Sequence, residues 1–214
     1  MWPQFRIQLY AHIPDRPDYV LAVLQANPHL LHAPVVANQT IFQFAAFHYP
    51  DFAPHLLDLG AKLDFISAIA LNRLDTVQAM LASRPHLIRR HSPDRFPAIH
   101  FAVRRSSPEM VSLLLAAGAD PNDRTSPQRH TPIFWAGRAP FANAALLLNA
   151  GADLHARAKH GFTVLHEAAK GGQAAFVEFL LAQGADRNLQ TDGRQTPWAL
   201  AVRFGHHEVA RLLR

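Results

Sequence analysis

The segment "HGFTVLHEAAKGGQ", which begins at His160, contains residue types that could bind a catalytic metal ion. It places His166 and Glu167 on a predicted helix and comes close to the zinc-protease signature. That signature needs two histidines four positions apart, so that both imidazoles reach one zinc ion. Lys170 occupies the second histidine position, and its ammonium group would repel a metal ion. We therefore expect a structural role for His166, with no catalytic residue and no metal ligand in this segment.

Three related segments, "LLLAAGADPND", "LLLNAGADLHA" and "FLLAQGADRNL", show that the chain is built from repeats. Their glycines, Gly118, Gly151 and Gly184, recur every 33 residues. Each glycine follows an apolar stretch with helical periodicity, where a left-handed residue ends a helix at low cost. A fixed period of this size is typical of a solenoid of stacked helix pairs.

The segment after each glycine predicts a tight turn and then a second helix. Asp and Asn in "GADPN" and "GADRN" favour the turn, and three threonines stand where a side-chain oxygen can cap the next helix. These threonines are Thr131, Thr163 and Thr196. Pro132 and Pro197 follow at the first helical position, which needs no N–H donor. Each unit is thus expected to be a hairpin-like loop, an inner helix, a turn and an outer helix.

These motifs resemble the ankyrin-repeat family, whose repeats carry Thr-Pro-Leu-His-x-Ala followed by Leu-Leu and Gly-Ala-Asp. The segment from Thr163 to Ala169 matches the first part, and that from Leu180 to Asp186 matches the second. In that family the histidine braces neighbouring hairpins through hydrogen bonds, a role that the resemblance gives to His100 and His166. The fold that it implies is all-α, an ankyrin-type solenoid of about seven stacked helix pairs with short β-hairpin-like loops.

Repeats near the N-terminus depart from the family pattern. Asn72 replaces the expected glycine between two helices, and Pro85 stands where the Gly-Ala-Asp ending is expected. "DYVLAVLQANPHLL" aligns with "DTVQAMLASRPHLI" 57 residues later, which indicates a divergent first repeat. We expect a single solenoid over 1–214, divided into 1–33 (N-terminal cap), 34–62, 63–91, 92–124, 125–157, 158–190 and 191–214 (C-terminal cap).

Composition excludes several functional classes. The chain has no cysteine, which rules out disulfides and thiol catalysis, and no phosphate-binding or nucleophile-elbow motif, so we expect neither an enzyme nor a bound cofactor. The charge of +5 comes from basic residues spread along the chain, which allows weak polyanion binding but indicates no specific nucleic-acid site. No run approaches the roughly 18 apolar residues of a membrane span. With no secretory signal at the start, a cytoplasmic monomer is expected.

Aligned inner helices predict a partner-binding surface. One position is basic in the last four units, beside a second position that is partly aromatic. Helix-end cations have a structural explanation, because they interact favourably with the helix dipole, and packing between helices is the structural explanation for the aromatic residues. Arg and Trp are nevertheless enriched at binding hot spots. The predicted partner-binding residues are Phe101, Arg104, Arg105, Trp135, Arg138, Phe162, Lys170, Arg203 and Phe204.

The sequence thus favours a protein that binds another protein, with an acidic segment, through the concave face of the stack. An inhibitor or immunity-type protein that occludes an enzyme is an alternative within the same class. A weak polyanion or nucleic-acid binder is the alternative of another class.

Overall fold

The computed structural model describes residues 9, 11–34, 39–92, 95–138 and 141–214, and the chain divides into two compact units, 1–94 and 95–214. The described helices are short, and the loops between them form no strand within these residues. The chain is therefore all-α, as the periodicity and the repeat motifs predict.

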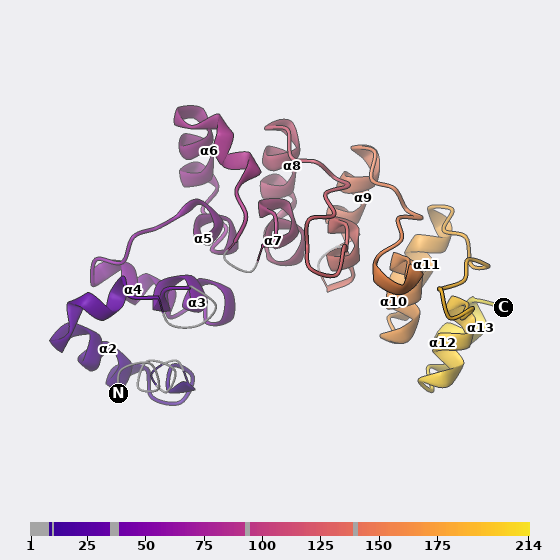
Figure 1. The fold of residues 1–214 in the computed structure, drawn as a ribbon, viewed down its shortest axis with the longest axis horizontal. Coiled ribbons are helices and arrows are strands. Elements are labelled where there is room, and N and C mark those ends of the chain that lie inside the picture. The colour runs from indigo at the N-terminus through magenta and orange to yellow at the C-terminus, as the bar shows by residue number, and fades with distance from the viewer. Residues whose placement is uncertain (1–8, 10, 35–38, 93–94, 139–140) are drawn as a thin grey trace. The chain divides into compact units, whose positions relative to one another are not determined.

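The second unit consists of four helix pairs that follow one another along the chain, ending with α12 and α13 in yellow (Figure 1). The inner elements pack on inner neighbours and the outer helices on outer neighbours. Fully buried leucines and valines, among them Leu114, Leu147, Leu165 and Leu180, fill the space between them. The pairs are α7 (Ala98–Arg105) with α8 (Pro108–Ala116), η3 (Pro132–Arg138) with α9 (Phe141–Asn149), α10 (Val164–Lys170) with α11 (Ala174–Ala182), and α12 (Pro197–Arg203) with α13 (His207–Leu212).

The repeated glycines end the outer helices in the expected left-handed conformation, with φ of +91° at Gly118, +88° at Gly151 and +91° at Gly184. At each, the glycine N–H and the next N–H bond back to carbonyls three and five residues earlier, as in Gly184 N to Leu181 O at 3.0 Å. This bonding satisfies carbonyls that a helix end leaves without partners. The 33-residue period therefore reflects a helix end that recurs in each repeat.

Backbone hydrogen bonds give the loops their hairpin character. Within single loops, Ala158 N donates to Phe162 O at 2.7 Å and Thr191 N donates to Gln195 O at 3.0 Å. Neighbouring loops are joined as well, for example by Asp192 N donating to His160 O at 3.0 Å. The loops thus stack on one another as the helices do.

One inner helix and its cap differ from the expectation. η3 (Pro132–Arg138) is a 3₁₀ helix, and the buried Thr131 hydroxyl before it has no hydrogen-bond partner among the described residues. Two aromatic residues and Gly137 give this segment a low intrinsic preference for the α-helix. The prediction that Thr131 caps a helix is therefore wrong, whereas Thr196 accepts from Ala199 N at 3.2 Å.

The first unit contains α2 (Pro17–Ala26), η1 (Pro28–Leu31), α3 (Ile41–His48), α4 (Ala53–Asp58), α5 (Phe65–Ala70), α6 (Leu74–Ser83) and η2 (Pro85–Arg89). Asn72 takes the place of the usual glycine with φ of +53°, a conformation that asparagine tolerates better than other side chains. The two segments aligned at an offset of 57 both form a ten-residue helix followed by a 3₁₀ turn that starts at proline. The sequence comparison within the chain thus identifies a repeated structural element.

Candidate functional site

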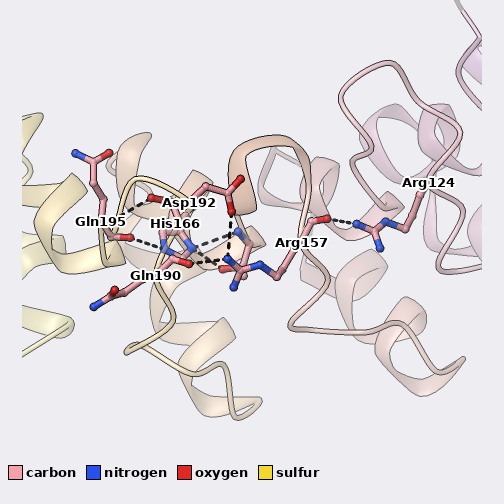
Figure 2. A network of polar contacts seen from close by, with 8 residues as sticks. Arg124, Arg157, His166, Gln190, Asp192 and Gln195 are labelled. Carbon is pink, nitrogen blue, oxygen red and sulfur yellow. Dashed lines mark hydrogen bonds and ion pairs between the residues drawn. The ribbon is translucent and has the colours of Figure 1, made fainter.

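His166 lies fully buried in α10 and connects two neighbouring loops. Its Nδ1 atom accepts a hydrogen bond from the N–H of Thr163 at 3.2 Å and lies 2.8 Å from the Thr163 hydroxyl. Its Nε2 atom lies 3.0 Å from the carbonyl oxygen of Gln195 in the next loop (Figure 2). These partners assign the neutral tautomer with hydrogen on Nε2, because Nδ1 acts as the acceptor.

Burial lowers the pKa of His166 from its ordinary value, partly offset by the hydrogen bond to the Gln195 carbonyl, which favours the charged form. A proton on Nδ1 would also break the hydrogen bond from the Thr163 N–H, which needs Nδ1 as its acceptor. The ring is therefore held neutral, and both of its nitrogens are engaged by protein groups. No position remains for a substrate proton or a metal ion.

The charges next to His166 pair with each other. Glu167 Oε2 lies 3.8 Å from Lys170 Nζ, so the carboxylate pairs with the ammonium group on its own helix. Across residues 9, 11–34, 39–92, 95–138 and 141–214, no group of three or more His, Asp or Glu side chains could hold a metal ion. The likeness of "HEAAK" to a zinc-protease helix thus ends at His166 and Glu167, because Lys170 occupies the second histidine position.

His100 in α7 repeats the Nε2 contact of this arrangement, because its Nε2 lies 2.9 Å from the carbonyl oxygen of His130 in the next loop. Pro97 stands at the position of Thr163, so the Nδ1 contacts with a threonine are not repeated. Arginines at equivalent positions add a second set of loop contacts, which the sequence interpretation did not include. Arg124 donates to the Arg157 carbonyl, and Arg157 donates to the Gln190 carbonyl at 2.8 Å (Figure 2). The 33-residue spacing of Arg124, Arg157 and Gln190 is the signal that could have revealed this ladder.

The predicted basic and aromatic positions meet in cation–aromatic pairs. The Arg104 guanidinium lies 5.0 Å from the ring centroid of Trp135, and Arg203 lies 5.7 Å from Phe204. The Lys170 ammonium lies 5.7 Å from the ring of Phe162. A cation within about 6 Å of a ring is attracted by its electron density, worth roughly 0.5–1 kcal/mol at an exposed site. Sequence reasoning identified the two stripes but not this pairing.

The other predicted partner-binding residues occupy varied surroundings. Phe101 is half-buried, with its ring edge-on to Phe96 at 6.2 Å. Arg105 is exposed at the end of α7. Arg138 ends η3, but its side chain lies outside the described residues.

A hollow of about 460 Å³ opens between η3 and α10 in the second unit. Arg104 and Lys170 line it together with Trp135, Phe134 and Phe176, and Glu167 supplies the one carboxylate among its described lining residues. Burial lowers the pKa of His130, which also lines the hollow and stacks on Phe134 with ring centroids 4.7 Å apart. The hollow therefore offers cationic groups beside aromatic rings, a combination suited to acidic and apolar side chains.

Two exposed apolar residues on α12 escaped the sequence prediction. Trp198 is 40% exposed, whereas Leu165, its equivalent 33 residues earlier, is 1% exposed. Val202 is 48% exposed against 0% for Ala169. α12 packs on α10 and covers Leu165 and Ala169. No described residue covers Trp198 and Val202 in this way. A tryptophan at a repeat position that holds isoleucine or leucine in the three preceding pairs (Ile99, Ile133 and Leu165) is the sequence signal for this surface.

No helix among the described residues is both long enough and apolar enough to cross a membrane. Comparisons with known proteins agree with the repeat architecture. The chain is 28% identical over 171 residues to SH3 and multiple ankyrin repeat domains protein 2 from Homo sapiens, covering 78% of this chain and 9% of that protein. It is 35% identical over 115 residues to Ankyrin repeat and SOCS box protein 6 from Homo sapiens, covering 50% and 27%.

A third relative, Delta-latroinsectotoxin-Lt1a from Latrodectus tredecimguttatus, is 33% identical over 114 residues, covering 47% of this chain and 9% of that protein. The chain thus spans less than a third of the length of these relatives. The family model described as "Ankyrin repeats (3 copies)" matches residues 65–158 and 141–214, which together are more than half of the chain. With its stacked helix pairs, left-handed glycines and loop-bracing histidines, the chain belongs to the ankyrin-repeat family, whose repeats are protein–protein interaction modules.

Proposed function

We propose that the second unit binds an acidic segment of a partner protein along the ends of its inner helices. The observation that carries this proposal is the set of three cation–aromatic pairs formed by Arg104, Lys170 and Arg203. Among the described residues that line the hollow between η3 and α10, Glu167 alone opposes the positive charge. An acidic segment would complement this surface.

Contact with an aromatic ring reduces the entropy that each basic side chain loses when it binds a partner. Long basic side chains lose rotamer entropy when they are immobilised, at about 0.5–1.5 kcal/mol for each side chain. Contact with the ring of Trp135 already restricts Arg104, and contact with Phe162 restricts Lys170. Lys170 and Arg203 nevertheless remain exposed, so a carboxylate can still reach them. The rings themselves supply apolar area of the kind found at binding hot spots.

Gly137 helps to shape the hollow. A Cβ atom at this position would lie 2.5 Å from Gln173 Oε1 and 2.7 Å from Phe176 Cδ1. Those side chains line the same hollow, so a larger residue would displace its wall. The close approach of η3 to α11 thus depends on glycine here.

The test replaces Arg104, Arg138 and Arg203 together with glutamine. The matched control replaces Arg187, Arg211 and Arg214, which removes the same charge from the loop and outer helix of the last pairs. Immobilised wild type and variants are exposed to extract from cells that express the protein, and the retained proteins are quantified at low and high salt. Exposed ion pairs contribute about 0.5–1 kcal/mol each, so the first variant should bind roughly ten- to a hundredfold more weakly at low salt.

The difference between the first variant and wild type should shrink at high salt, because exposed charges are screened. The amount of protein that the control variant retains should stay within about threefold of wild type, since Arg187, Arg211 and Arg214 lie away from the inner-helix ends. Equal retention by the first variant and wild type at low salt would leave the three arginines as helix-end cations only. An equal loss in both variants would indicate non-specific attraction by net charge.

The expected cytoplasmic location, the absence of catalysis and the monomeric state belong to the same proposal. Sedimentation of the purified protein tests the oligomeric state, and cell fractionation tests the location. Occlusion of an enzyme by the same surface would appear as inhibition of a captured partner.

A further inference from the structure

The first unit contains a second hollow, of about 510 Å³, beside the start of α5. Its walls come from α3, α5, α6 and η2, so it lies where Pro85 and the 3₁₀ turn replace the Gly-Ala-Asp loop of the regular repeat. Phe47, Phe65 and Leu87 line it and keep 7%, 5% and 7% of their surface exposed. Small-molecule sites have similar volumes, of roughly 300–1,000 Å³.

The charges at this hollow are unbalanced. Arg84 and Arg90 line it with exposed side chains, and neither forms an ion pair with any residue that the structure describes. Asp64 is the one carboxylate among its described lining residues, and it is already engaged as the cap of α5. It accepts from Ile66 N and Ser67 N at 3.0 Å each, from Ser67 Oγ at 2.8 Å and from Gln43 Nε2 at 3.1 Å.

The chain itself shows that local folding does not require these arginines. The segment that aligns with η2 carries Asn27 in place of Arg84 and Ala33 in place of Arg90. Both segments make the same backbone bonds: Leu30 N to Asn27 O and Leu87 N to Arg84 O, each at 3.0 Å. The next bond is also shared, from Ala33 N to Leu30 O at 3.4 Å and from Arg90 N to Leu87 O at 2.8 Å. Asparagine and alanine thus suffice at these positions, and the guanidinium groups are available for another role.

We propose that this hollow binds a small amphipathic anion, with an apolar body against Phe47, Phe65 and Leu87 and a carboxylate between Arg84 and Arg90. Arginine presents paired N–H donors that match the two oxygens of a carboxylate. Phe47, Phe65 and Leu87 supply a small apolar contact beside the two guanidinium groups, so an apolar body should add to the affinity of a carboxylate. The apolar residues together with the two arginines define the ligand class. This proposal does not depend on partner binding by the second unit.

The test uses decanoate below its micelle concentration, titrated calorimetrically into the full chain. Decanol and decylamine carry the same apolar chain with a neutral and a cationic head. The decisive variant is Arg84→Asn with Arg90→Ala, which installs the residues of the aligned segment. Arg89→His is the control, because it installs His32 from the same segment at an exposed position that does not line the hollow.

Decanoate is expected to bind with one-to-one stoichiometry, and the double variant should bind about tenfold more weakly, since each exposed ion pair contributes roughly a factor of three. Arg89→His should stay within about twofold of wild type, and decylamine should not bind. Melting temperatures of all variants should agree closely. No binding of decanoate, or equal binding by the double variant, would overturn the proposal. Selective binding to vesicles of anionic phospholipid, with no binding of free decanoate, would also overturn it in favour of a membrane surface.

Discussion

Replacing His166 with alanine should destabilise the second unit strongly, because the side chain has three polar contacts and no exposure. The change removes the hydrogen bond to the Gln195 carbonyl, worth about 1 kcal/mol. It also leaves the buried N–H and hydroxyl of Thr163 without their acceptor, at about 1–3 kcal/mol. Loss of packing around the missing ring adds to this. We expect a total of about 3–5 kcal/mol.

For a chain of this size, 1 kcal/mol corresponds to roughly 2–4 °C in melting temperature, so thermal unfolding should occur about 10 °C earlier. His207→Ala is the matched control, because His207 is exposed at the start of α13. Differential scanning calorimetry checks both variants, with and without zinc or a chelator. A shift below about 2 °C for His166→Ala would refute the bracing role. A zinc-dependent shift in wild type would refute the non-catalytic assignment.

Three further outcomes are expected from the described geometry. Burial lowers the pKa of His166 and His130, so these rings bind protons less readily in the fold than in the unfolded chain, where histidine titrates near pH 6.5. Stability should therefore fall as pH drops from 7 to 5, less steeply for His166→Gln, as denaturant titrations would show. Gly151→Ala meets no atom within 4 Å but must keep φ of +88°, so it should cost about 1–2 kcal/mol in the same assay. Arg157→Met removes the contact with the Gln190 carbonyl and the exposed ion pair with Asp192, and it should cost about 1 kcal/mol, with faster amide hydrogen exchange in the 186–195 loop.

Sequence reasoning predicted the features that recur with a fixed period. Gly118 and Gly184 mark helix ends because few other residues adopt their backbone conformation, so the pattern and the structure have one physical cause. Asn72 was recognisable for the same reason. The 3₁₀ character of η3 was not predicted, because Pro132 at a first helical position is compatible with either helix type.

The candidate sites were predicted less completely, because they depend on contacts between distant residues. The basic and aromatic stripes were visible, but nothing in the spacing showed that Arg104 would lie over Trp135 of the next pair. Exposure of Trp198 depends on whether another helix packs on that face of α12, which no local pattern encodes. The hollow beside α5 is lined by residues of α3, α5, α6 and η2, so only the fold reveals it.

Comparison of equivalent repeat positions separates structural cations from candidate binding cations. Arg124 and Arg157 recur at one position and both donate to a carbonyl of the next loop, so a structural role accounts for them. Arg84 has Asn27 as its counterpart in a segment with the same backbone bonds, so local structure does not account for it.

Arg104 and Arg203 fall between these cases, because they recur and also end their helices, where a cation contributes about 0.3–1 kcal/mol through the helix dipole. Stability and affinity measured on the same variant separate the two roles. If the dipole accounts for these residues, replacing them with glutamine lowers the melting temperature and leaves partner binding unchanged. If these arginines serve binding, the mutual repulsion among the cations should offset the stabilisation that each gains from its helix dipole. The melting temperature then stays constant or rises while affinity falls in a salt-dependent way.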